Sequence, residues 1–223
     1  MASPLLEVAG VQVSPDHYID GRRVGSAQTF ELFSPIDQAV LGRIAEGTAE
    51  HVDAAIRAAE RAFPAWSALS AAERKPLLER FADEIGKRAD AFCLLESNDA
   101  GVLLSRMRHG VVPRAMLNIR WFAEHALTLQ DRPLDTEQAH HIVRHDPAGV
   151  AAIITPWNSP LLLSTWKLGP ALAAGNTCVL KPPEWAPLTC SLLADAAQAA
   201  GLPPGVFNMV QGSGANTGAR LVG

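Results

Sequence analysis

The sequence predicts an α/β fold: an N-terminal helical region beside an incomplete, doubly wound parallel sheet. Amphipathic helical periodicity begins at Thr48 and fills much of the first half of the chain. From residue 150 onward, short apolar runs alternate with helical runs in the order strand, helix, strand, helix, strand. The chain has 223 residues and is 48% hydrophobic, which is enough to build a substantial core.

Composition favours a protein that acts on small molecules. The 19 basic and 23 acidic residues give a formal charge of -4 with no basic block, so the sequence predicts no nucleic-acid partner and no membrane partner. The opening "MASPLLEVAG" lacks a positive region before an apolar core, and no later run approaches ~18 apolar residues. Three cysteines without CxxC spacing suit reduced thiols. We therefore expect a cytoplasmic protein.

Short strands come first and long helices follow. The segments "HYIDGRRV", "TFELFSP" and "AVLGRIAEG" alternate apolar with polar residues and are separated by Gly, Pro and Asp, which predicts strands or hairpins. Helical runs then begin behind Thr48 and Ser70, two residues that favour helix N-caps, and a third surrounds "VPRAMLNIRWFAEHA". These helices are expected to pack on the later sheet.

A polar connector, "LQDRPLDTEQAH", separates the helices from the second half of the chain. The following "HHIVRHDPAGVAAIITP" predicts two extended segments broken at Pro147 and Gly149. We therefore divide the chain into N-terminal strands and packing helices (1–133), a hairpin (134–149) and the alternating unit (150–223). His140, His141 and His145 fall in an alternating strand, where a solvated face is expected and no metal site is predicted.

The alternating unit predicts a right-handed, Rossmann-like βαβαβ arrangement. Its apolar first run is typical of a strand that is buried on both faces of a parallel sheet. In order, its segments are "GVAAIITP", "PLLLSTWKLGPALAAG", "NTCVLKPP", "PLTCSLLADAAQAAG" and "GVFNMVQG".

Polar residues follow these strands, where ligands of parallel sheets bind. Asn158 follows the first strand, and Lys181 and Glu184 follow the second. Ser159 is a favoured N-cap and Pro160 a favoured first helical residue, so the Asn158 carboxamide is expected to be free for a ligand. Two alternatives remain open: Asn158 bonds its own turn, and Lys181 with Glu184 forms only a surface ion pair.

The segment "TPWNSPLLLSTWKLGPALAAGNTCVLKPPEWAPLT", followed by "AAGLPPGVFNMVQGSG", closely resembles the aldehyde dehydrogenase superfamily. The resemblance extends more weakly from "YIDGRRV" to the last residue. The "STWK" segment and the "PRA…RWFA" helix are most similar to enzymes that oxidise hydroxymuconic semialdehydes, including the 5-carboxymethyl-2-hydroxymuconate type. The betaine aldehyde dehydrogenases are a nearby branch.

The resemblance implies a nicotinamide cofactor and a catalytic role for Asn158. The Asn158 amide would hold the oxyanion formed when a cysteine thiolate attacks the aldehyde, on a path through a thiohemiacetal and a thioester. Lys181 and Glu184 would hold the adenosine ribose, and the Glu184 carboxylate favours NAD over NADP because it repels a 2′-phosphate. Trp157 would lie beside the cofactor, with a buried core tryptophan as the alternative. The implied cofactor-binding residues are Ile154, Thr155, Pro156, Trp157, Lys181, Glu184, Gly212 and Gly214.

The resemblance also implies an aldehyde channel. Ser159, Leu163 and Trp166 have i, i+4 and i+7 spacing, so they share the helix face beside Asn158, although core packing is an alternative for Leu163. Arg114 lies on another helix that borders the channel in the family, where its guanidinium could hold a substrate carboxylate. A solvated helix arginine is the alternative.

The chain also departs from the family. It ends before the second glycine motif, the glutamate base and the nucleophilic cysteine, and Val102 follows Gly101 where members carry Gly-Lys. We therefore expect this chain alone to be inactive, with homo-oligomers forming in a full-length protein. A non-catalytic remnant that binds nucleotide or another subunit is the alternative. Cys93 and Cys178 are expected to have raised pKa values, and Cys190 a lowered one beside a helix N-terminus.

Overall fold

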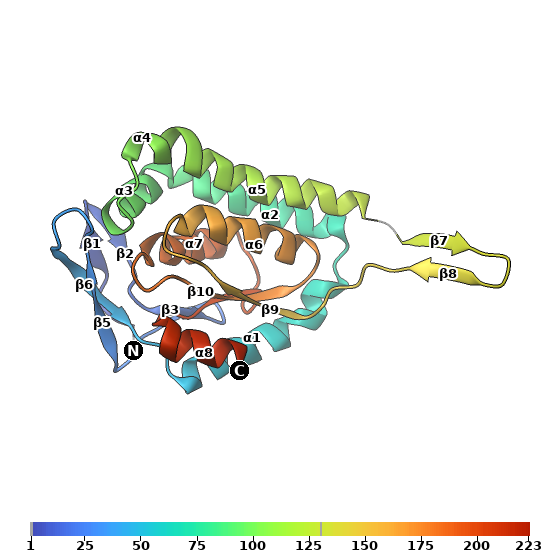
Figure 1. Ribbon diagram of the computed structural model, residues 1–223, viewed down its shortest axis with the longest axis horizontal. Helices are drawn as coiled ribbons and strands as arrows, with labels where there is room; N and C mark the ends of the chain where they lie inside the picture. The colour runs from blue at the N-terminus through green and yellow to red at the C-terminus, as the bar shows by residue number, and fades with distance from the viewer. Residues whose placement is uncertain (1, 130) are drawn as a thin grey trace.

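The computed structural model describes residues 2–129 and 131–223, and its centre is a five-stranded sheet with the order β4-β3-β11-β10-β9 (Figure 1). The strands β9 (Val150–Ile154), β10 (Thr177–Lys181) and β11 (Phe207–Met209) are parallel. This confirms the predicted α/β class and the β-α-β-α-β order of the second half. All five residues of β10 are buried. The burial on both faces predicted for the first run is wrong, because β9 lies at the edge of the sheet, where Ala152 and Ile154 are exposed.

The sheet is mixed rather than purely parallel. A hairpin of β3 (His17–Ile19) and β4 (Arg22–Val24) adds to the edge of β11 in the antiparallel direction, through the pairing of Met209 with Tyr18. The predicted "HYIDGRRV" hairpin therefore covers one edge of the parallel unit, although its sequence alone did not indicate which strand it would meet. An occupied edge is no longer a template for association.

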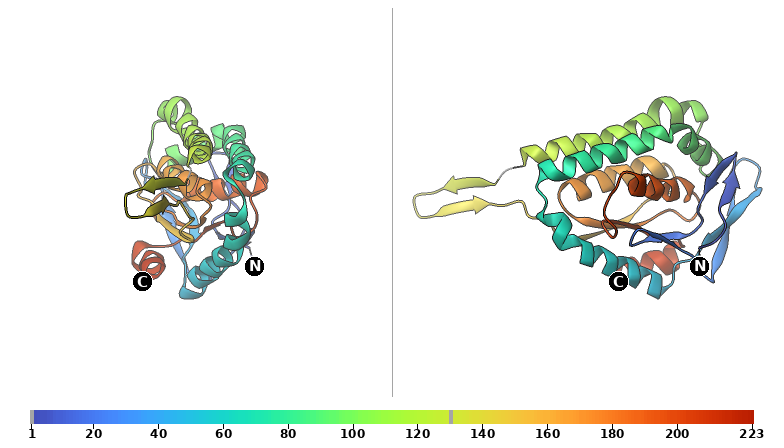
Figure 2. Two further views of the ribbon diagram at one scale, coloured as in Figure 1. Left: turned by 90° about the vertical axis from the view of Figure 1, so that its right-hand side faces the viewer. Right: turned by 180° about the vertical axis from the view of Figure 1, so that it is seen from behind.

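Helices cover both faces of the sheet, as Figures 1 and 2 show. On one face lies α1 (Ala49–Ala68), which contacts β9, β10 and β11. On the other face lie α6 (Pro160–Ala173) and α7 (Leu188–Ala199), the two crossover helices. An outer layer of α2 (Ala71–Lys87) and α5 (Val112–His125) packs on α6 and α7.

The remaining elements connect or extend these layers. The sequence analysis did not predict the short hairpin of β1 (Leu6–Val8) and β2 (Val11–Val13). In chain order, the elements are β1 (Leu6–Val8), β2 (Val11–Val13), β5 (Thr29–Phe33), β6 (Val40–Ala45), α3 (Ala89–Asp99), α4 (Leu104–Arg106), the π-helical turn Met107–Val111, the 3₁₀ turn Ala126–Thr128, β7 (Arg132–Asp135), β8 (His140–Val143), the π-helical turn Gly214–Gly218 and α8 (Ala219–Val222).

The hairpin of β7 and β8 projects from the body, and all of its strand residues are exposed (Figure 1). His140 contacts Asp135 across the hairpin, while His141 lies on the same exposed strand. Within residues 2–129 and 131–223, no group of three or more His, Cys, Asp or Glu side chains could hold a metal ion. In the same residues no helix combines the length and the apolar character needed to cross a membrane.

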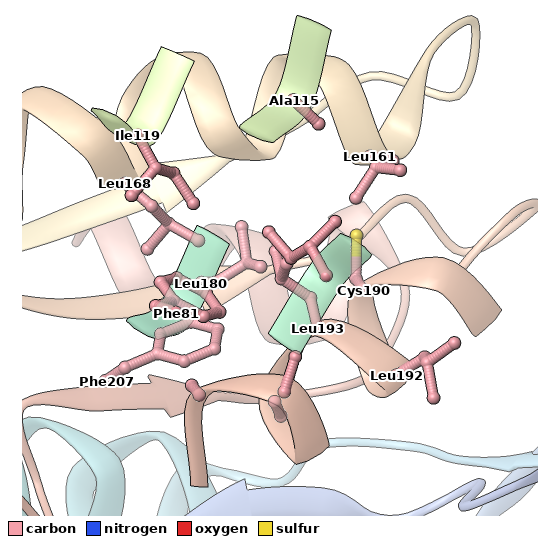
Figure 3. Packing of buried hydrophobic residues seen from close by; sticks show 14 of the residues in the cluster. Phe81, Ala115, Ile119, Leu161, Leu168, Leu180, Cys190, Leu192, Leu193 and Phe207 are labelled. Atoms are coloured by element: carbon pink, nitrogen blue, oxygen red, sulfur yellow. The ribbon is translucent and has the colours of Figure 1, made fainter. Parts of the chain in front are cut away.

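The main core joins the sheet to α6 and α7 and then to the outer helices (Figure 3). Leu180 of β10 and Leu193 of α7 are fully buried, as is Phe81 on α2. Leu168 of α6 and Ile119 of α5 complete the contact between layers. Because this core ties α6 to β10, it fixes the loops at the carboxyl ends of the strands.

We expect Leu78→Ala to lower the free energy of unfolding by about 2–5 kcal/mol, since Leu78 of α2 is 0% exposed and truncation leaves a cavity. Leu5→Ala is the matched control, because Leu5 is 57% exposed and its loss is expected to change stability by less than about 0.5 kcal/mol. Urea denaturation measures both. Equal losses would contradict the assignment of Leu78 to the core.

Candidate functional site

The carboxyl ends of β9 and β10 and the loop after β11 border one cleft of about 370 Å³. All of the predicted cofactor-binding residues except Gly212 line it. The cleft-lining residues are Ile154, Thr155, Pro156, Trp157, Lys181, Pro183, Glu184, Trp185 and Gly214. A concave site with mostly apolar walls and a few charged groups is typical of a small-molecule site.

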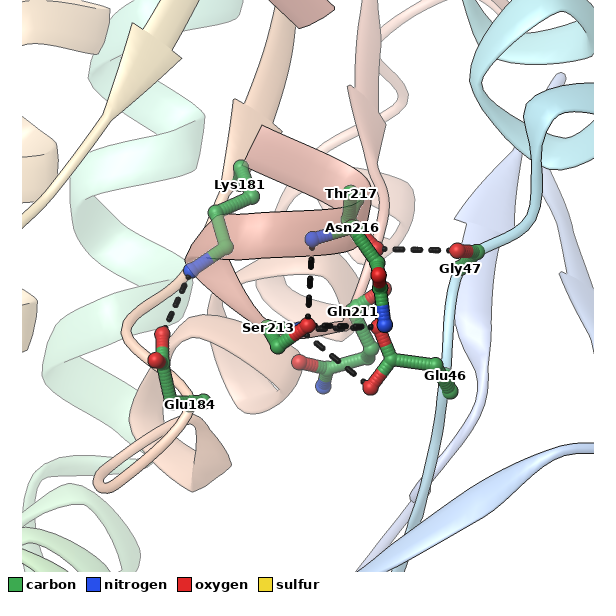
Figure 4. Close-up of polar contacts among 8 residues, drawn as sticks. All are labelled: Glu46, Gly47, Lys181, Glu184, Gln211, Ser213, Asn216 and Thr217. Carbon is green, nitrogen blue, oxygen red and sulfur yellow. Dashed lines mark hydrogen bonds and ion pairs between the residues drawn. The ribbon is translucent and has the colours of Figure 1, made fainter. Parts of the chain in front are cut away.

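Lys181 and Glu184 form an ion pair in this cleft, with 2.9 Å between Lys181 Nζ and Glu184 Oε2 (Figure 4). The Lys181 side chain is 3% exposed, whereas that of Glu184 is 34% exposed. Partial burial acts to raise the pKa of Glu184, but the hydrogen bond and charge of Lys181, together with backbone hydrogen bonds, outweigh it and hold this pKa below its usual range. The cleft therefore presents a partly exposed, ionised carboxylate.

Gly212 does not line the cleft and lies instead where two loops approach each other closely. It is buried with φ +140°, and a Cβ there would lie 1.9 Å from Thr217 Oγ1. Thr217 in turn donates to the Gly47 carbonyl at 3.1 Å, which ties the loop after β11 to the segment before α1 (Figure 4). Gly212 thus allows a close approach of two loops, while Gly214 faces the cleft.

Glu46 holds the start of the same loop. Its carboxylate accepts from the Ser213 backbone N–H at 3.0 Å and from the Ser213 hydroxyl at 2.9 Å (Figure 4). Ser213 Oγ also accepts from Asn216 N–H at 3.3 Å, which closes the π-helical turn. The segment "GSGANTG" is therefore a tightly bonded turn.

Two exposed tryptophans flank the cleft. Trp157 is 55% exposed, so the alternative of a buried core tryptophan is wrong. Trp185 is 67% exposed, and its ring centroid lies 6.4 Å from that of Trp157. Sequence reasoning missed Trp185, although its place directly after Glu184 at a strand end was a signal.

Asn158 is exposed in the turn between β9 and α6, and it lines a separate cavity of about 250 Å³. Among the residues that the structure describes, none hydrogen-bonds with its carboxamide, so the alternative of an Asn158 turn bond is not seen. Ser159 is the N-cap of α6, but its hydroxyl makes no capping hydrogen bond, contrary to expectation. The Asn158 amide is free, although not for the reason that the sequence suggested.

The capping group of α6 is Glu96, which comes from α3. Its Oε2 accepts from Leu161 N–H at 3.1 Å and from the Thr189 hydroxyl of α7 at 2.9 Å. One turn later, Asp99 Oδ2 accepts from Leu188 N–H at 2.8 Å at the start of α7. Two buried carboxylates therefore hold the first turns of both crossover helices.

Burial has the largest effect on the pKa values of Glu96 and Asp99. It raises the pKa of Glu96 to about 7 and raises that of Asp99 well above its usual range, against the opposing effect of the accepted hydrogen bonds. Glu96 Oε1 and Asp99 Oδ1 have no hydrogen-bond partner in the described part of the chain. Sequence reasoning missed both residues, although two carboxylates three apart at the end of an apolar helix were the available signal.

The predicted substrate residues divide between two cavities. Arg114 and Trp166 line a groove of about 470 Å³ between α5 and α6. Ser159 instead lines the cavity of Asn158, and the half-buried Leu163 lines neither. The further residues of the groove are Leu117, Asn118, Trp121, Phe122 and Lys167.

All three cysteines are buried and unpaired. Burial raises the pKa of Cys93 and Cys178, as expected. The expectation for Cys190 was wrong, because burial raises its pKa to about 12 despite the neighbouring Ser164 hydroxyl, whose Oγ lies 3.3 Å from Cys190 Sγ. None of these thiols is activated as a nucleophile.

The sequence profile of the aldehyde dehydrogenase family matches residues 23–223. The chain belongs to this family. It is 42% identical over 207 residues to the 2-hydroxymuconic semialdehyde dehydrogenase of Pseudomonas sp. (strain CF600), a match that covers 89% of this chain and 42% of the relative. This family member therefore spans less than half the length of that relative.

Solved structures agree with the family assignment. HpcC from Thermus thermophilus superposes with a TM-score of 0.89 and 42% identity, covering 97% of this chain and 45% of that protein. The P. syringae AldA indole-3-acetaldehyde dehydrogenase, solved in complex with NAD+ and IAA, gives a TM-score of 0.90 at 36% identity, with 95% and 44% covered. At these identities and TM-scores, the chain has the fold of the corresponding part of these structures.

The buried carboxyl of Glu96 predicts a pH-dependent stability. Its folded pKa of about 7 exceeds its ordinary value of 4.5, so its contribution is fully present below pH 4.5 and is lost as the pH rises through 7. In urea denaturation, the stability of the wild type relative to Glu96→Gln is expected to fall by on the order of 3 kcal/mol over this range. Glu73→Gln is the control, because Glu73 also caps a helix but is exposed. A constant difference between wild type and Glu96→Gln would contradict the assignment.

Proposed function

We propose that this chain forms the dinucleotide-binding part of an NAD-dependent aldehyde dehydrogenase that oxidises a carboxylate-bearing semialdehyde of aromatic catabolism to the acid. The supporting observation is the cleft at the ends of β9 and β10, which gathers Trp157, Lys181, Glu184 and Gly214 from three separate loops. These residues combine an aromatic surface, a cation and an ionised carboxylate, which suit a ribose and its attached phosphate.

The residues present fit NAD better than NADP. A carboxylate accepts hydrogen bonds from both ribose hydroxyls but repels a 2′-phosphate, and the lowered pKa of Glu184 keeps its carboxyl ionised. Lys181 Nζ, fixed by Glu184, supplies a cation that suits either cofactor. The bound nicotinamide would accept the hydride from the aldehyde carbon. The solved P. syringae relative contains NAD+, which supports this choice.

Asn158 is proposed to stabilise the charge that develops on the aldehyde oxygen. When a thiolate adds to the carbonyl, the oxygen becomes an oxyanion, and the exposed Asn158 amide can donate to it. The thiohemiacetal that results would be oxidised to a thioester, which water hydrolyses. Since Cys93, Cys178 and Cys190 are buried with raised pKa values, the thiolate must come from outside this chain. We therefore expect this chain alone to be inactive.

The substrate assignment rests on the groove between α5 and α6. Arg114 is exposed there beside Trp166, and in the described part of the chain no carboxylate forms an ion pair with it. A guanidinium can bind a carboxylate through two parallel hydrogen bonds. The name of the Pseudomonas relative, a muconic semialdehyde dehydrogenase, supports the same substrate class.

We propose the following organisation for the protein. Residues 1–133 and 150–223 form the cofactor-binding unit, and the hairpin of 134–149 joins subunits of a homo-oligomer. The exposed apolar side chains of Leu134 and Ile142 on this hairpin support a contact with another chain. The unpaired thiols suit the reducing cytoplasm.

A second candidate is a non-catalytic module that binds a nucleotide or another subunit. The raised pKa values of the three cysteines favour it, since no thiol of this chain is fit to attack an aldehyde. The two functions differ in one measurement: the enzyme reduces NAD when an aldehyde is added, and the non-catalytic module does not.

In the intact enzyme, Asn158→Ala is expected to lower kcat by roughly 10²–10³, because the amide acts on charge that is present only in the transition state. The Kd for NAD is expected to stay within about two-fold, since the cofactor cleft does not include Asn158. Steady-state kinetics and calorimetry measure the two quantities. Asn98→Ala is the control, as the Asn98 amide donates only to its own helix at Leu94. Equal losses of turnover and NAD affinity would exclude the oxyanion role.

Glu184→Gln is expected to weaken NAD binding roughly ten-fold and to narrow the preference for NAD over NADP, because an amide does not repel a 2′-phosphate. Isothermal titration with each dinucleotide measures the change. Glu79→Gln, on the exposed face of α2, is the control and should alter neither affinity. Unchanged selectivity in Glu184→Gln would remove this residue from the cofactor site.

A further inference from the structure

The cavity that contains Asn158 is cationic and separate from the groove of Arg114. It lies between the start of α6 and the segment from the end of α3 to α5, two regions that meet at one end of the molecule (Figure 1). Its volume is about 250 Å³, and Arg106 is the charged residue among those described that line it. The other lining residues are Gly101, Val102, Leu103, Val111, Asn158 and Ser159.

Arg106 is available to bind an anion. Its side chain is exposed, and among the described residues no carboxylate lies within ion-pair distance of it. Two residues later, Arg108 is already occupied, with its Nη2 lying 3.0 Å from Asp90 Oδ1. The two neighbouring arginines therefore differ. Arg108 is paired with a carboxylate of the chain, whereas Arg106 lines a cavity in which no described lining residue is a carboxylate.

The Asn158 amide also favours a ligand that carries oxygen atoms. It is without a hydrogen-bond partner in the described part of the chain and can donate to such an oxygen, whereas the start of α6 is already occupied by the Glu96 carboxylate. Among the described residues that line the cavity, none is acidic. A ligand with one carboxylate and one polar oxygen could meet Arg106 and Asn158 together.

We propose that Arg106 binds the carboxylate of a short acid aldehyde whose carbonyl oxygen lies at Asn158. The proposal rests on the function proposed above, because it takes Asn158 as the group that meets the aldehyde. The volume of about 250 Å³ limits the ligand, since it is below the roughly 300–1,000 Å³ of sites for larger ligands. A short chain with acid and aldehyde ends fits this limit.

Arg106 and Arg114 then divide substrates by length. Arg114 lies in the larger groove with Trp166, which does not include Asn158, so it can hold only a carboxylate that is remote from the reacting carbon. Arg106 shares a cavity with Asn158, so it can hold a carboxylate that is near the reacting carbon. Arg106 therefore binds a carboxylate that is near the aldehyde group, and Arg114 binds one that is remote from it.

Binding of succinate tests the site without turnover. Succinate keeps the nearby carboxylate and lacks the aldehyde, and its affinity is measured by isothermal titration of the protein. Arg106→Gln is expected to weaken binding roughly 10- to 100-fold, the effect of losing a hydrogen-bonded charge pair, whereas Arg108→Gln is expected to leave it unchanged. Equal affinity in the wild type and Arg106→Gln, or no succinate binding by the wild type, would overturn the proposal even if the protein oxidises aldehydes.

Turnover by the intact enzyme provides the second test. Arg106→Gln is expected to lower kcat/KM for succinic semialdehyde roughly 10- to 100-fold but to spare butanal, its neutral analogue, and a muconic semialdehyde. Arg114→Ala is expected to affect the muconic semialdehyde and spare succinic semialdehyde. A uniform loss over all three aldehydes in Arg106→Gln would overturn the assignment of Arg106. Failure of the wild type to oxidise any of them would instead refute the proposed enzyme, while the succinate titration still decides the Arg106 site.

Discussion

The candidate site depends on two buried carboxylates that hold the crossover helices. Glu96 accepts from the start of α6 and Asp99 from the start of α7, at 3.1 Å and 2.8 Å. Both side chains belong to α3, so one rigid helix sets the positions of two others. The turn with Asn158 directly precedes α6, and the loop with Glu184 directly precedes α7. The separation of these two loops of the candidate site is therefore fixed by α3.

This arrangement has an energetic cost. Burial disfavours the charged carboxylate, and each carboxyl keeps one oxygen without a hydrogen-bond partner among the described residues. Two backbone N–H groups would otherwise be left unpaired at the buried ends of α6 and α7. The helix ends offset part of the desolvation cost, because their partial positive charge favours a carboxylate. A compact joint between three helices is the result.

The parallel sheet gathers the remaining groups. Its three parallel strands end at one edge, where the Lys181–Glu184 pair, Trp157 and the turn of Gly214 meet. Gly212 lets this last turn approach the segment of Gly47 before α1, which brings the loop after β11 into place. The two sites also differ in charge: the cleft contains the Lys181–Glu184 ion pair, while Arg106 is the one charged residue among those described that line the cavity of Asn158.

The sequence by itself determined the α/β class, the strand and helix order of the second half, and most of the residues that line the cleft at the ends of β9 and β10. These features follow from local periodicity and from the rule that parallel strands present their carboxyl ends together. Only the tertiary structure decided that Glu96 rather than Ser159 caps α6, that β3 covers the edge of β11, and that Arg106 shares a cavity with Asn158. Such contacts join residues far apart in the chain, so they depend on how helices and strands pack, which no local pattern records.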